Sequence, residues 1–547
     1  MLGTMMQYPL TLTAVLERAG RLFGASEIVS RLPDRTLHRC SYAEMYQRSR
    51  ALAAALAASG LRRGDRVGSL MWNHVWHLEA YFGVPASGCV LHTLNPRLHP
   101  DELAYIVNHG GDRVLIIDDI LLPLYEKFRH KVHPELVIVA PAAGERAPAG
   151  CAGYLDFLTR AAEGYEFPQL DENEAAVMCY TSGTTGQPKG VVYSHRALIL
   201  HALTIALTDC FCISLDDTVL PVVPMFHANA WGVPSAATML GAKQVLPGPH
   251  LDPASLLELL AGEKVTRAAG VPTVWLGVLE LLESDPKRWE LQPNLMVAVG
   301  GAALPESMIQ AFDRLGIQVR HAWGMTEITP VGSVSALKSH MSEWPAQKRL
   351  AMRAKQGVPL PFIEIRAMEG ERTVPWDGQT MGELQVRGPW VAAGYYNSPQ
   401  QQQQSWTPDG WFRTGDVVTI DPEGYIKISD RTKDLIKSGG EWISSVELEN
   451  ALMGHPAVRE AAVIGIPHPR WQERPLAAVV LKPDSSATPD ELRDHLAAKF
   501  SRWQLPDAFV FIEEIPRTSV GKFQKTRLRE MFAGWEWPDS ATLRTAE

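Results

Sequence analysis

Apolar side chains recur at helical and at strand spacing in alternation along most of the chain. Residues 42–61 carry apolar positions at helical spacing up to Gly60, which predicts a helix. The short apolar run at 66–70 that follows predicts a buried strand. Because such alternation is typical of α/β proteins, we expect an α/β fold with substantially parallel sheets.

The same pattern continues in the middle of the chain. Residues 272–282 predict a helix that begins with proline, which suits a first helical turn. A buried strand is expected at 295–299, a glycine turn at 300–301, a helix from about 305 and a strand at 318–323. Ligands collect at the carboxyl ends of such strands, so this region is a candidate site.

The residue pattern and composition of the sequence change near Asp430. The preceding residues 424–429 alternate like a strand, whereas the following ones are dense in charge and glycine. We therefore expect an N-terminal domain over 1–430, a hinge at 431–434 and a small α/β domain over 435–547. A capping box at 488–491 predicts a helix start in the second domain.

Length and charge narrow the classes of function. The chain has 547 residues, too many for one compact core, and 52 basic against 61 acidic residues give a net charge of -9. Such a chain has no overall attraction to nucleic acid or anionic membranes. We expect no transmembrane segment and a cytoplasmic protein, since no long apolar run or signal-like start occurs. The 6 scattered cysteines are expected to be reduced.

The strongest chemical signal is the segment YTSGTTGQPKG at 180–190, which follows an apolar, strand-like run. Glycines let backbone N–H groups approach phosphate oxygens, hydroxyls add donors, and lysine adds positive charge. It is not a Walker loop, because glycine follows the lysine. The candidate phosphate-binding residues are Thr181, Ser182, Gly183, Thr184, Thr185 and Lys189.

This segment resembles the signature loop of the adenylate-forming superfamily, which includes acyl-CoA synthetases, peptide-synthetase adenylation domains and luciferases. Further motifs follow in the family's order, and the chain is most similar to bacterial medium- to long-chain fatty acyl-CoA synthetases. The resemblance implies the adenylate-forming enzyme fold, with a large multi-subdomain N-terminal domain and a small mobile C-terminal lid. It also implies a ligase that uses ATP, Mg²⁺ and coenzyme A, and a homodimer.

The segment WGMTE at 323–327 resembles the family's aromatic-Gly-x-Thr-Glu motif. An aromatic face can cover a purine ring, and a carboxylate can hold a magnesium ion that bridges phosphates. The resemblance places Mg²⁺ on Glu327 with help from Thr184, and the AMP phosphate near Thr326. Tyrosine is usual where this chain has Trp323, which keeps the stacking face without a phenol hydroxyl. The other nucleotide contacts implied are Gly301, Ala302, His321 and Ala322.

The segment WFRTGD at 411–416 resembles the family's ribose motif. An aspartate that accepts from both ribose hydroxyls is also found in dinucleotide-binding folds, so Asp416 is the ribose candidate. By resemblance Arg431 reaches the ribose and Lys433 is the pivot of the hinge. The family more often has glycine where this chain has Asp430, so the sequence leaves the turn geometry open there.

The C-terminal part carries the remaining nucleotide and thiol candidates. The segment PRTSVGK at 516–522 resembles the loop whose lysine forms the adenylate, which makes Lys522 the catalytic candidate. A cation is needed because attack on the α-phosphate builds negative charge. Lys437 and Trp442 resemble nucleotide contacts, and Gly439 and Gly440 suit a channel for the CoA thiol arm.

The acyl pocket is expected around the apolar segment 221–231. His227 and Trp231 resemble residues that guard the acyl tunnel of fatty acyl-CoA synthetases, and ordinary core packing is the alternative for both. Ala228 and Val271 are further candidates for the pocket wall. No charged residue stands out in these stretches, which favours an aliphatic acid over one with a charged tail.

Together these motifs predict an ATP-dependent acid–thiol ligase that makes acyl-AMP and pyrophosphate, and then acyl-CoA and AMP. Residues near 184, 327, 416 and 522 must then converge on one ATP. Alternatives are a short thioether acid such as 3-(methylthio)propionate as substrate, transfer to a carrier-protein thiol, or a non-catalytic nucleotide- or acyl-binding module. Glu327 and Lys522 are both present, which argues against the non-catalytic module, because binding alone requires neither residue.

Overall fold

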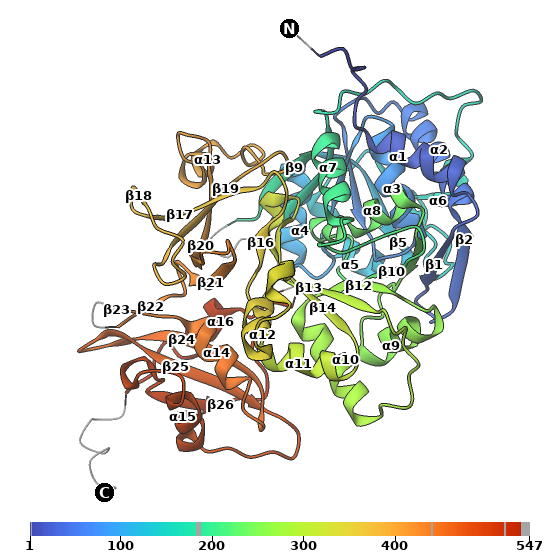
Figure 1. Ribbon diagram of the computed structural model, residues 1–547. Coiled ribbons are helices and arrows are strands. Elements are labelled where there is room, and N and C mark those ends of the chain that lie inside the picture. The colour runs from blue at the N-terminus through green and yellow to red at the C-terminus, as the bar shows by residue number, and fades with distance from the viewer. Residues whose placement is uncertain (2, 182–186, 439–440, 519–520, 538–547) are drawn as a thin grey trace, which may run out of the picture.

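The computed structural model describes residues 1, 3–181, 187–438, 441–518 and 521–537. Two largely parallel sheets form the N-terminal body, an antiparallel sheet adjoins them, and a fourth sheet forms the C-terminal body (Figure 1). The fold is therefore α/β with substantially parallel sheets, as the alternation of elements predicts.

The first sheet runs in the order β16–β15–β14–β13–β12–β10–β11–β1–β2 and is parallel from β1 through β14. Its antiparallel edges are β2 on one side and β15 with β16 on the other. The strands are β1 (Glu27–Arg31), β2 (Leu37–Ser41), β10 (Thr218–Pro221), β11 (Lys243–Leu246), β12 (Arg267–Gly270), β13 (Met296–Gly300), β14 (Gln318–Gly324), β15 (Val331–Val334) and β16 (Val358–Pro359).

The second sheet runs in the order β7–β6–β5–β3–β4–β8–β9 and is parallel except for its last pair. The strands are β3 (Arg66–Leu70), β4 (Val90–Thr93), β5 (Asp112–Asp118), β6 (Leu136–Ala140), β7 (Ala152–Gly153), β8 (Ala175–Thr181) and β9 (Lys189–Ser194).

The two remaining sheets are mostly antiparallel. The third has the order β18–β17–β19–β20–β21, with β17 (Glu364–Glu369), β18 (Arg372–Thr373), β19 (Gly382–Arg387), β20 (Phe412–Ile420) and β21 (Ile426–Arg431). The fourth has the order β23–β22–β25–β24 with β26 beside β25, and consists of β22 (Ile436–Ser438), β23 (Glu441–Ile443), β24 (Val458–His468), β25 (Gln472–Leu481) and β26 (Ala508–Phe511).

Helices cover both faces of the parallel sheets, which explains why their strands are apolar on both sides. In β13, Met296 and Ala298 join the core between the two sheets, whereas Val297 and Val299 pack under the outer helices. The inner layer contains α1 (Leu12–Leu22), α2 (Tyr42–Ala58), α3 (Val75–Ala86), α6 (Tyr154–Leu158), α7 (His195–Ile205) and α8 (Val233–Leu240).

The outer helices flank the two parallel sheets. The first sheet is covered by α9 (Pro253–Gly262), α10 (Pro272–Ser284) and α11 (Glu306–Arg314), and the second by α4 (Pro100–Gly110) and α5 (Leu122–Glu126). The remaining helices are α12 (Ala346–Ala354), α13 (Pro399–Ser405), α14 (Ser445–Leu452), α15 (Pro489–Ala497) and α16 (Lys525–Met531).

The element predictions agree with this fold. The expected helix at 42–61 ends at Ala58, because Gly60 takes a positive φ of 84° that stops the helix. The strands expected at 66–70, 295–299 and 318–323 are β3, β13 and β14. Thr488 and Glu491 form the capping box at the start of α15.

Candidate functional site

The predicted ribose carboxylate is held from two sides. Asp416 on β20 is 2% exposed, and its Oδ2 accepts a hydrogen bond of 2.9 Å from Nε1 of Trp323 on β14. Its Oδ1 lies 3.0 Å from Nε of Arg431, which is its register partner on β21. The indole of Trp323 therefore donates an N–H to the carboxylate expected to bind ribose, and the side chain offers more than a stacking face.

The predicted metal ligand lies beside a tyrosine that the sequence reading missed. Tyr395 donates its hydroxyl to Oε1 of Glu327 at 2.7 Å, and Nζ of Lys189 lies 4.8 Å from the centre of the Tyr395 ring. Among the described residues Oε2 of Glu327 has no hydrogen-bond partner. Mg²⁺ commonly binds through one carboxylate together with substrate phosphates. A Glu327 carboxylate with one oxygen held by Tyr395 and the other available therefore fits a magnesium–ATP complex.

The candidate catalytic lysine reaches from the C-terminal body into this site. Burial lowers the pKa of Lys522 to about 8, with Arg431 contributing, while Asp416 and Glu327 act in the opposite direction. These interactions place Lys522 within electrostatic range of both carboxylates. Three of the four residues predicted to surround ATP, Asp416, Glu327 and Lys522, thus lie near one another, whereas Thr184 lies outside the described residues.

The backbone at the end of β13 leaves room for the Lys522 side chain. Gly301 has a φ of 87°, and a Cβ built there would lie 3.3 Å from Cε of Lys522 and 3.4 Å from a methyl carbon of Val271. Glycine therefore allows the lysine to approach the strand end closely. Beside it a cavity of about 260 Å³ opens between α10, α11 and the C-terminal body, lined in part by Val271, Gly301 and Lys522.

His321 on β14 lies within hydrogen-bond distance of two neighbouring segments, one of which is expected to line adenine. Its Nε2 lies 3.3 Å from the carbonyl oxygen of Ala302, and its Nδ1 lies 3.0 Å from that of Ala354 at the end of α12. Burial lowers the pKa of His321, so the ring is neutral at neutral pH and can donate to one of the two carbonyls. Ala322, next on β14, is buried.

The candidate acyl segment has an unusual backbone. Ala228, Asn229, Ala230 and Trp231 have φ values of 42°, 55°, 47° and 57°, all in the left-handed region. Trp231 is 8% exposed, and a Cβ built on Gly300 would lie 3.2 Å from its ring. The turn thus packs an indole against the strand end at which the nucleotide candidates gather.

A cation near this segment was also missed by the sequence reading. Burial lowers the pKa of His227 to about 3, with further contributions from Lys522 and Arg97. The guanidinium carbon of Arg97 lies 5.4 Å from the ring centre of Trp72 and 6.0 Å from that of Phe226. Arg97 lies shortly after the carboxyl end of β4, and this position was the signal that could have identified it.

The residue that directly precedes the predicted hinge, Asp430, binds the C-terminal body. Asp430 accepts from the backbone N–H of Ser445 at 2.8 Å and also from its hydroxyl. Lys525 in turn binds Glu449 at 2.6 Å and the Ser445 hydroxyl. The aspartate that replaces the family's usual glycine therefore anchors the end of β21 to α14.

The remaining candidates lie further out or outside the described residues. Nζ of Lys437 lies 4.9 Å above the half-exposed ring of Trp442, and the carbonyl of Lys433 accepts from Arg529. Thr181 pairs with Lys189 across β8 and β9, and Thr326 is buried. Ser182, Gly183, Thr184, Thr185, Gly439 and Gly440 lie outside the described part of the chain.

Comparison with known proteins extends over nearly the whole chain. Residues 17–396 match the family model for AMP-binding enzymes, and residues 447–522 match that for the AMP-binding enzyme C-terminal domain. A long-chain-fatty-acid–CoA ligase of Thermus thermophilus is 54% identical, with 97% of each chain covered.

Two further relatives differ in the acid that their names give. A medium-chain-fatty-acid–CoA ligase of Ectopseudomonas oleovorans is 44% identical over 97% of this chain and 98% of its own. A 3-methylmercaptopropionyl-CoA ligase of Ruegeria pomeroyi is also 44% identical, over 97% of this chain and 99% of its own.

Among solved structures, the anthranilate CoA ligase AuaEII in complex with anthranoyl-AMP superposes with a TM-score of 0.87 at 26% identity, covering 96% of this chain and 99% of that one. Family models, relatives and fold agree along the length of the chain. The chain belongs to the family of AMP-binding enzymes, and it is an ATP-dependent, AMP-forming acid–CoA ligase.

Proposed function

We propose that the ligase activates a medium- to long-chain fatty acid. The observation that carries this proposal is the apolar surrounding of the acyl segment, where Ala228 and Trp231 are buried and His227 is neutral. Fatty acids are the substrates in the names of two relatives. Arg97 lies within electrostatic range of His227, and we assign it to the phosphate or carboxylate end of the site.

In the proposed first step the fatty acid carboxylate attacks the α-phosphate of ATP, and pyrophosphate leaves. Lys522 stabilises the negative charge of the transition state, since a buried cation in a preorganised site acts strongly there. Asp416 accepts from the ribose hydroxyls and is oriented by Trp323. Glu327 would hold Mg²⁺, which supplies positive charge to the phosphates when bound.

In the proposed second step the CoA thiolate attacks the acyl carbon, and AMP leaves. We propose that the domain over 435–547 first rotates about Lys433 within the hinge 431–434, relative to the domain over 1–430. This rotation withdraws Lys522 and opens a thiol channel beside Gly439 and Gly440. Such domain motions commonly separate the steps of a two-step reaction.

The role of Lys522 is tested by the variant Lys522→Ala. We expect pyrophosphate exchange into ATP to fall by about a hundredfold or more, because a transition-state cation is lost. The reaction of supplied acyl-AMP with CoA should change far less. Exchange at the wild-type rate would exclude Lys522 from adenylate formation.

The acid is tested by CoA-dependent AMP release across saturated acids of two to eighteen carbons. A 3-(methylthio)propionate sample in the same series tests the second candidate, which the Ruegeria pomeroyi relative favours. We expect the highest kcat/KM at eight carbons or more. A maximum at 3-(methylthio)propionate or at the shortest acids would overturn the fatty acid proposal. AMP release without free CoA, but with a carrier protein, would overturn CoA as acceptor.

We further propose a cytoplasmic homodimer. The cysteines are all free, which fits a reducing compartment. Among the described residues, no helix is long and apolar enough to cross a bilayer. Sedimentation equilibrium tests the dimer, and a monomer at micromolar concentration would contradict it.

A further inference from the structure

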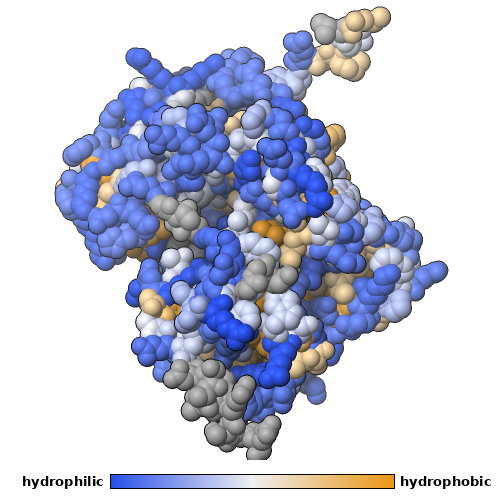
Figure 2. Space-filling model, turned by 90° about the vertical axis from the view of Figure 1, so that its left-hand side faces the viewer, coloured by the Kyte–Doolittle hydropathy of each residue, from blue (hydrophilic) through white to orange (hydrophobic). Residues whose placement is uncertain are grey.

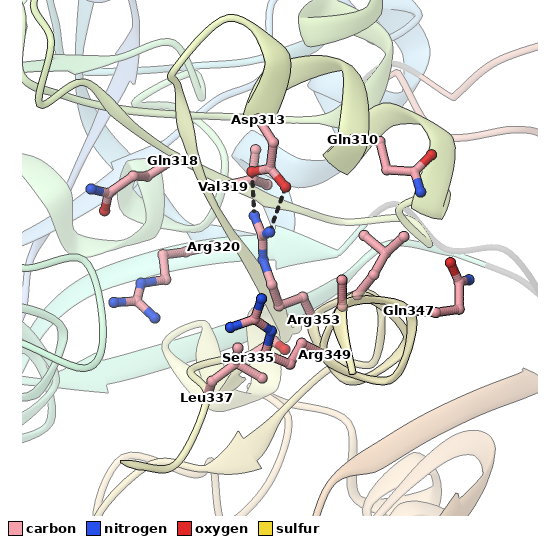
Figure 3. Close-up of a pocket in the computed structure, with 12 residues that line it drawn as sticks. Gln310, Asp313, Gln318, Val319, Arg320, Ser335, Leu337, Gln347, Arg349 and Arg353 are labelled. Carbon is pink, nitrogen blue, oxygen red and sulfur yellow. Dashed lines mark hydrogen bonds and ion pairs between the residues drawn. The ribbon is translucent and has the colours of Figure 1, made fainter. Parts of the chain in front are cut away.

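A second, polar pocket lies apart from the candidate active site. It measures about 630 Å³ and is bordered by α11, the start of β14 and α12 (Figure 3). Its walls carry Arg320, Arg349 and Arg353, together with the amides of Gln310, Gln318 and Gln347. None of these residues belongs to the nucleotide motifs of the sequence.

The charge of this pocket is positive. Arg353 and Asp313 neutralise each other through two hydrogen bonds of 2.6 and 2.9 Å. Arg349 donates to the carbonyl of Ser342, and in the described part of the chain neither Arg349 nor Arg320 has a carboxylate partner. Two guanidinium groups therefore face the pocket without a counter-ion from the protein, although the chain as a whole has a net charge of -9.

The remaining walls suit a hydrophilic ligand that carries an anionic group. Ala346 and Gln347, the first residues of α12, line the pocket, and no side chain caps this helix. Uncapped N–H groups at a helix start favour an anion, and guanidinium groups bind phosphate oxygens in pairs. A volume of about 630 Å³ is in the range of small-molecule sites, and its polar walls disfavour an acyl chain.

The pocket shares two elements with the adenine segment. Arg320 directly precedes His321 on β14, and His321 lies within hydrogen-bond distance of Ala354 at the end of α12 and of Ala302. In Figure 1, α12 lies where the N-terminal body, the third sheet and the C-terminal body meet. A ligand that braces α12 against β14 would therefore act on the position of His321.

We propose that this pocket binds a small phosphorylated molecule, of nucleotide or sugar-phosphate size, and that its occupancy changes the KM for ATP. The phosphate contacts Arg320 and Arg349, and the amide side chains bind the polar remainder of the ligand.

Calorimetry on the full chain tests the binding. The active site is first filled with an acyl-sulfamoyl adenosine, which resembles acyl-AMP but carries no phosphate. Adenosine 3′,5′-bisphosphate and inorganic pyrophosphate are then titrated separately, which distinguishes a nucleotide from a simple phosphate. We expect one equivalent of at least one probe to bind, and binding to weaken at least tenfold in the double variant Arg320→Gln, Arg349→Gln.

The variant Arg372→Gln is the matched control, because Arg372 is an exposed arginine paired with Glu369 on the third sheet. It should bind the probe as the wild type does, and thermal melting should show that both variants are folded. The proposal is overturned if the wild type takes up neither probe, or if the folded double variant binds as tightly as the wild type.

The effect on ATP is measured as the KM for ATP with and without the bound probe. Competition inside the active site would affect the wild type and the double variant equally. We expect an additional change of at least twofold in the wild type alone. Identical changes in both proteins would overturn the regulatory part of the proposal.

Discussion

At the scale of single residues, side chains from different sheets determine the geometry of the candidate nucleotide site. Trp323 and Asp416 are far apart in the sequence, yet their hydrogen bond joins β14 of the first sheet to β20 of the third. The motifs identified both residues by resemblance. Their contact could not be predicted, because it depends on how the two sheets pack.

The Trp323 hydrogen bond gives a test in which the ribose itself is varied. In Trp323→Phe an aromatic face is kept and the N–H donor to Asp416 is lost, so we expect the KM for ATP to rise by about tenfold. The preference for ATP over 2′-deoxy-ATP should fall with it, because Asp416 is then held by Arg431 alone. Trp471→Phe, at a half-exposed tryptophan of the C-terminal body, is the control. An unchanged preference in Trp323→Phe would contradict the orienting role.

The proposed role of Lys522 predicts that adenylate formation depends on pH. Because the pKa of Lys522 is lowered to about 8, the ammonium is present below that pH and is lost as the pH rises through it. We expect the rate of pyrophosphate exchange to fall above about pH 8. In Lys522→Arg the remaining activity should persist to higher pH, since arginine stays protonated. The same alkaline decline in both proteins would assign the titration to another group.

At the scale of elements, buried polar contacts hold the C-terminal body in the position observed. Asp430 at the end of β21 binds Ser445 at the start of α14, and Lys525 at the start of α16 binds the same serine and Glu449. This arrangement brings Lys522 to the nucleotide candidates. A rotation about the hinge would therefore have to break or carry along the Asp430–Ser445 contact.

We expect Asp430→Ala to impair the first half-reaction selectively. Loss of hydrogen bonds to a charged, buried acceptor should lower the rate of acyl-AMP formation by about tenfold. The transfer of supplied acyl-AMP to CoA should fall less, because in the proposed mechanism it uses the rotated arrangement. Both half-reactions are measured by quenched flow, with Asp490→Ala as a control on the surface of the C-terminal body. Equal losses in both half-reactions would contradict this selectivity.

The sequence predicted the elements of this fold better than their contacts. Apolar periodicity identified α2, β3, α10, β13 and β14, because buried strands and amphipathic helices are local patterns. Tyr395 and Arg97 were missed, since each lies in a connecting segment whose path depends on tertiary packing. The motif residues were found through family resemblance, and their spacing alone would not have assigned them to one site.

At the scale of the whole molecule, exposed charged side chains contribute to the contact between the two bodies. Figure 2 shows a face that is largely hydrophilic, with apolar patches that are small and scattered. Arg459 of the C-terminal body lies 2.9 Å from Glu280 of α10, and both side chains are 41% exposed. Such half-exposed ion pairs contribute little stability, so this pair alone opposes the separation of the two bodies only weakly.

The Arg459–Glu280 pair can be tested by exchanging its charges. Glu280→Arg places two like charges together, and we expect it to lower the rate of acyl-AMP formation by about two- to threefold at low salt. Combining it with Arg459→Glu should restore the rate. The effect should shrink in 0.5 M salt, because exposed charges are screened. A double variant no faster than Glu280→Arg would show that the pair does not orient the C-terminal body.

The left-handed turn from Ala228 to Trp231 limits how the acyl segment can evolve. Alanine and tryptophan are disfavoured in this region by about 1–2 kcal/mol each, whereas asparagine tolerates it, so Ala228, Ala230 and Trp231 together oppose a sizeable part of the stability of a domain. Branched side chains at these positions would add to that strain, whereas glycine would relieve it and loosen the indole. Adaptation to a different acid is therefore easier through the walls around the turn than through the turn itself.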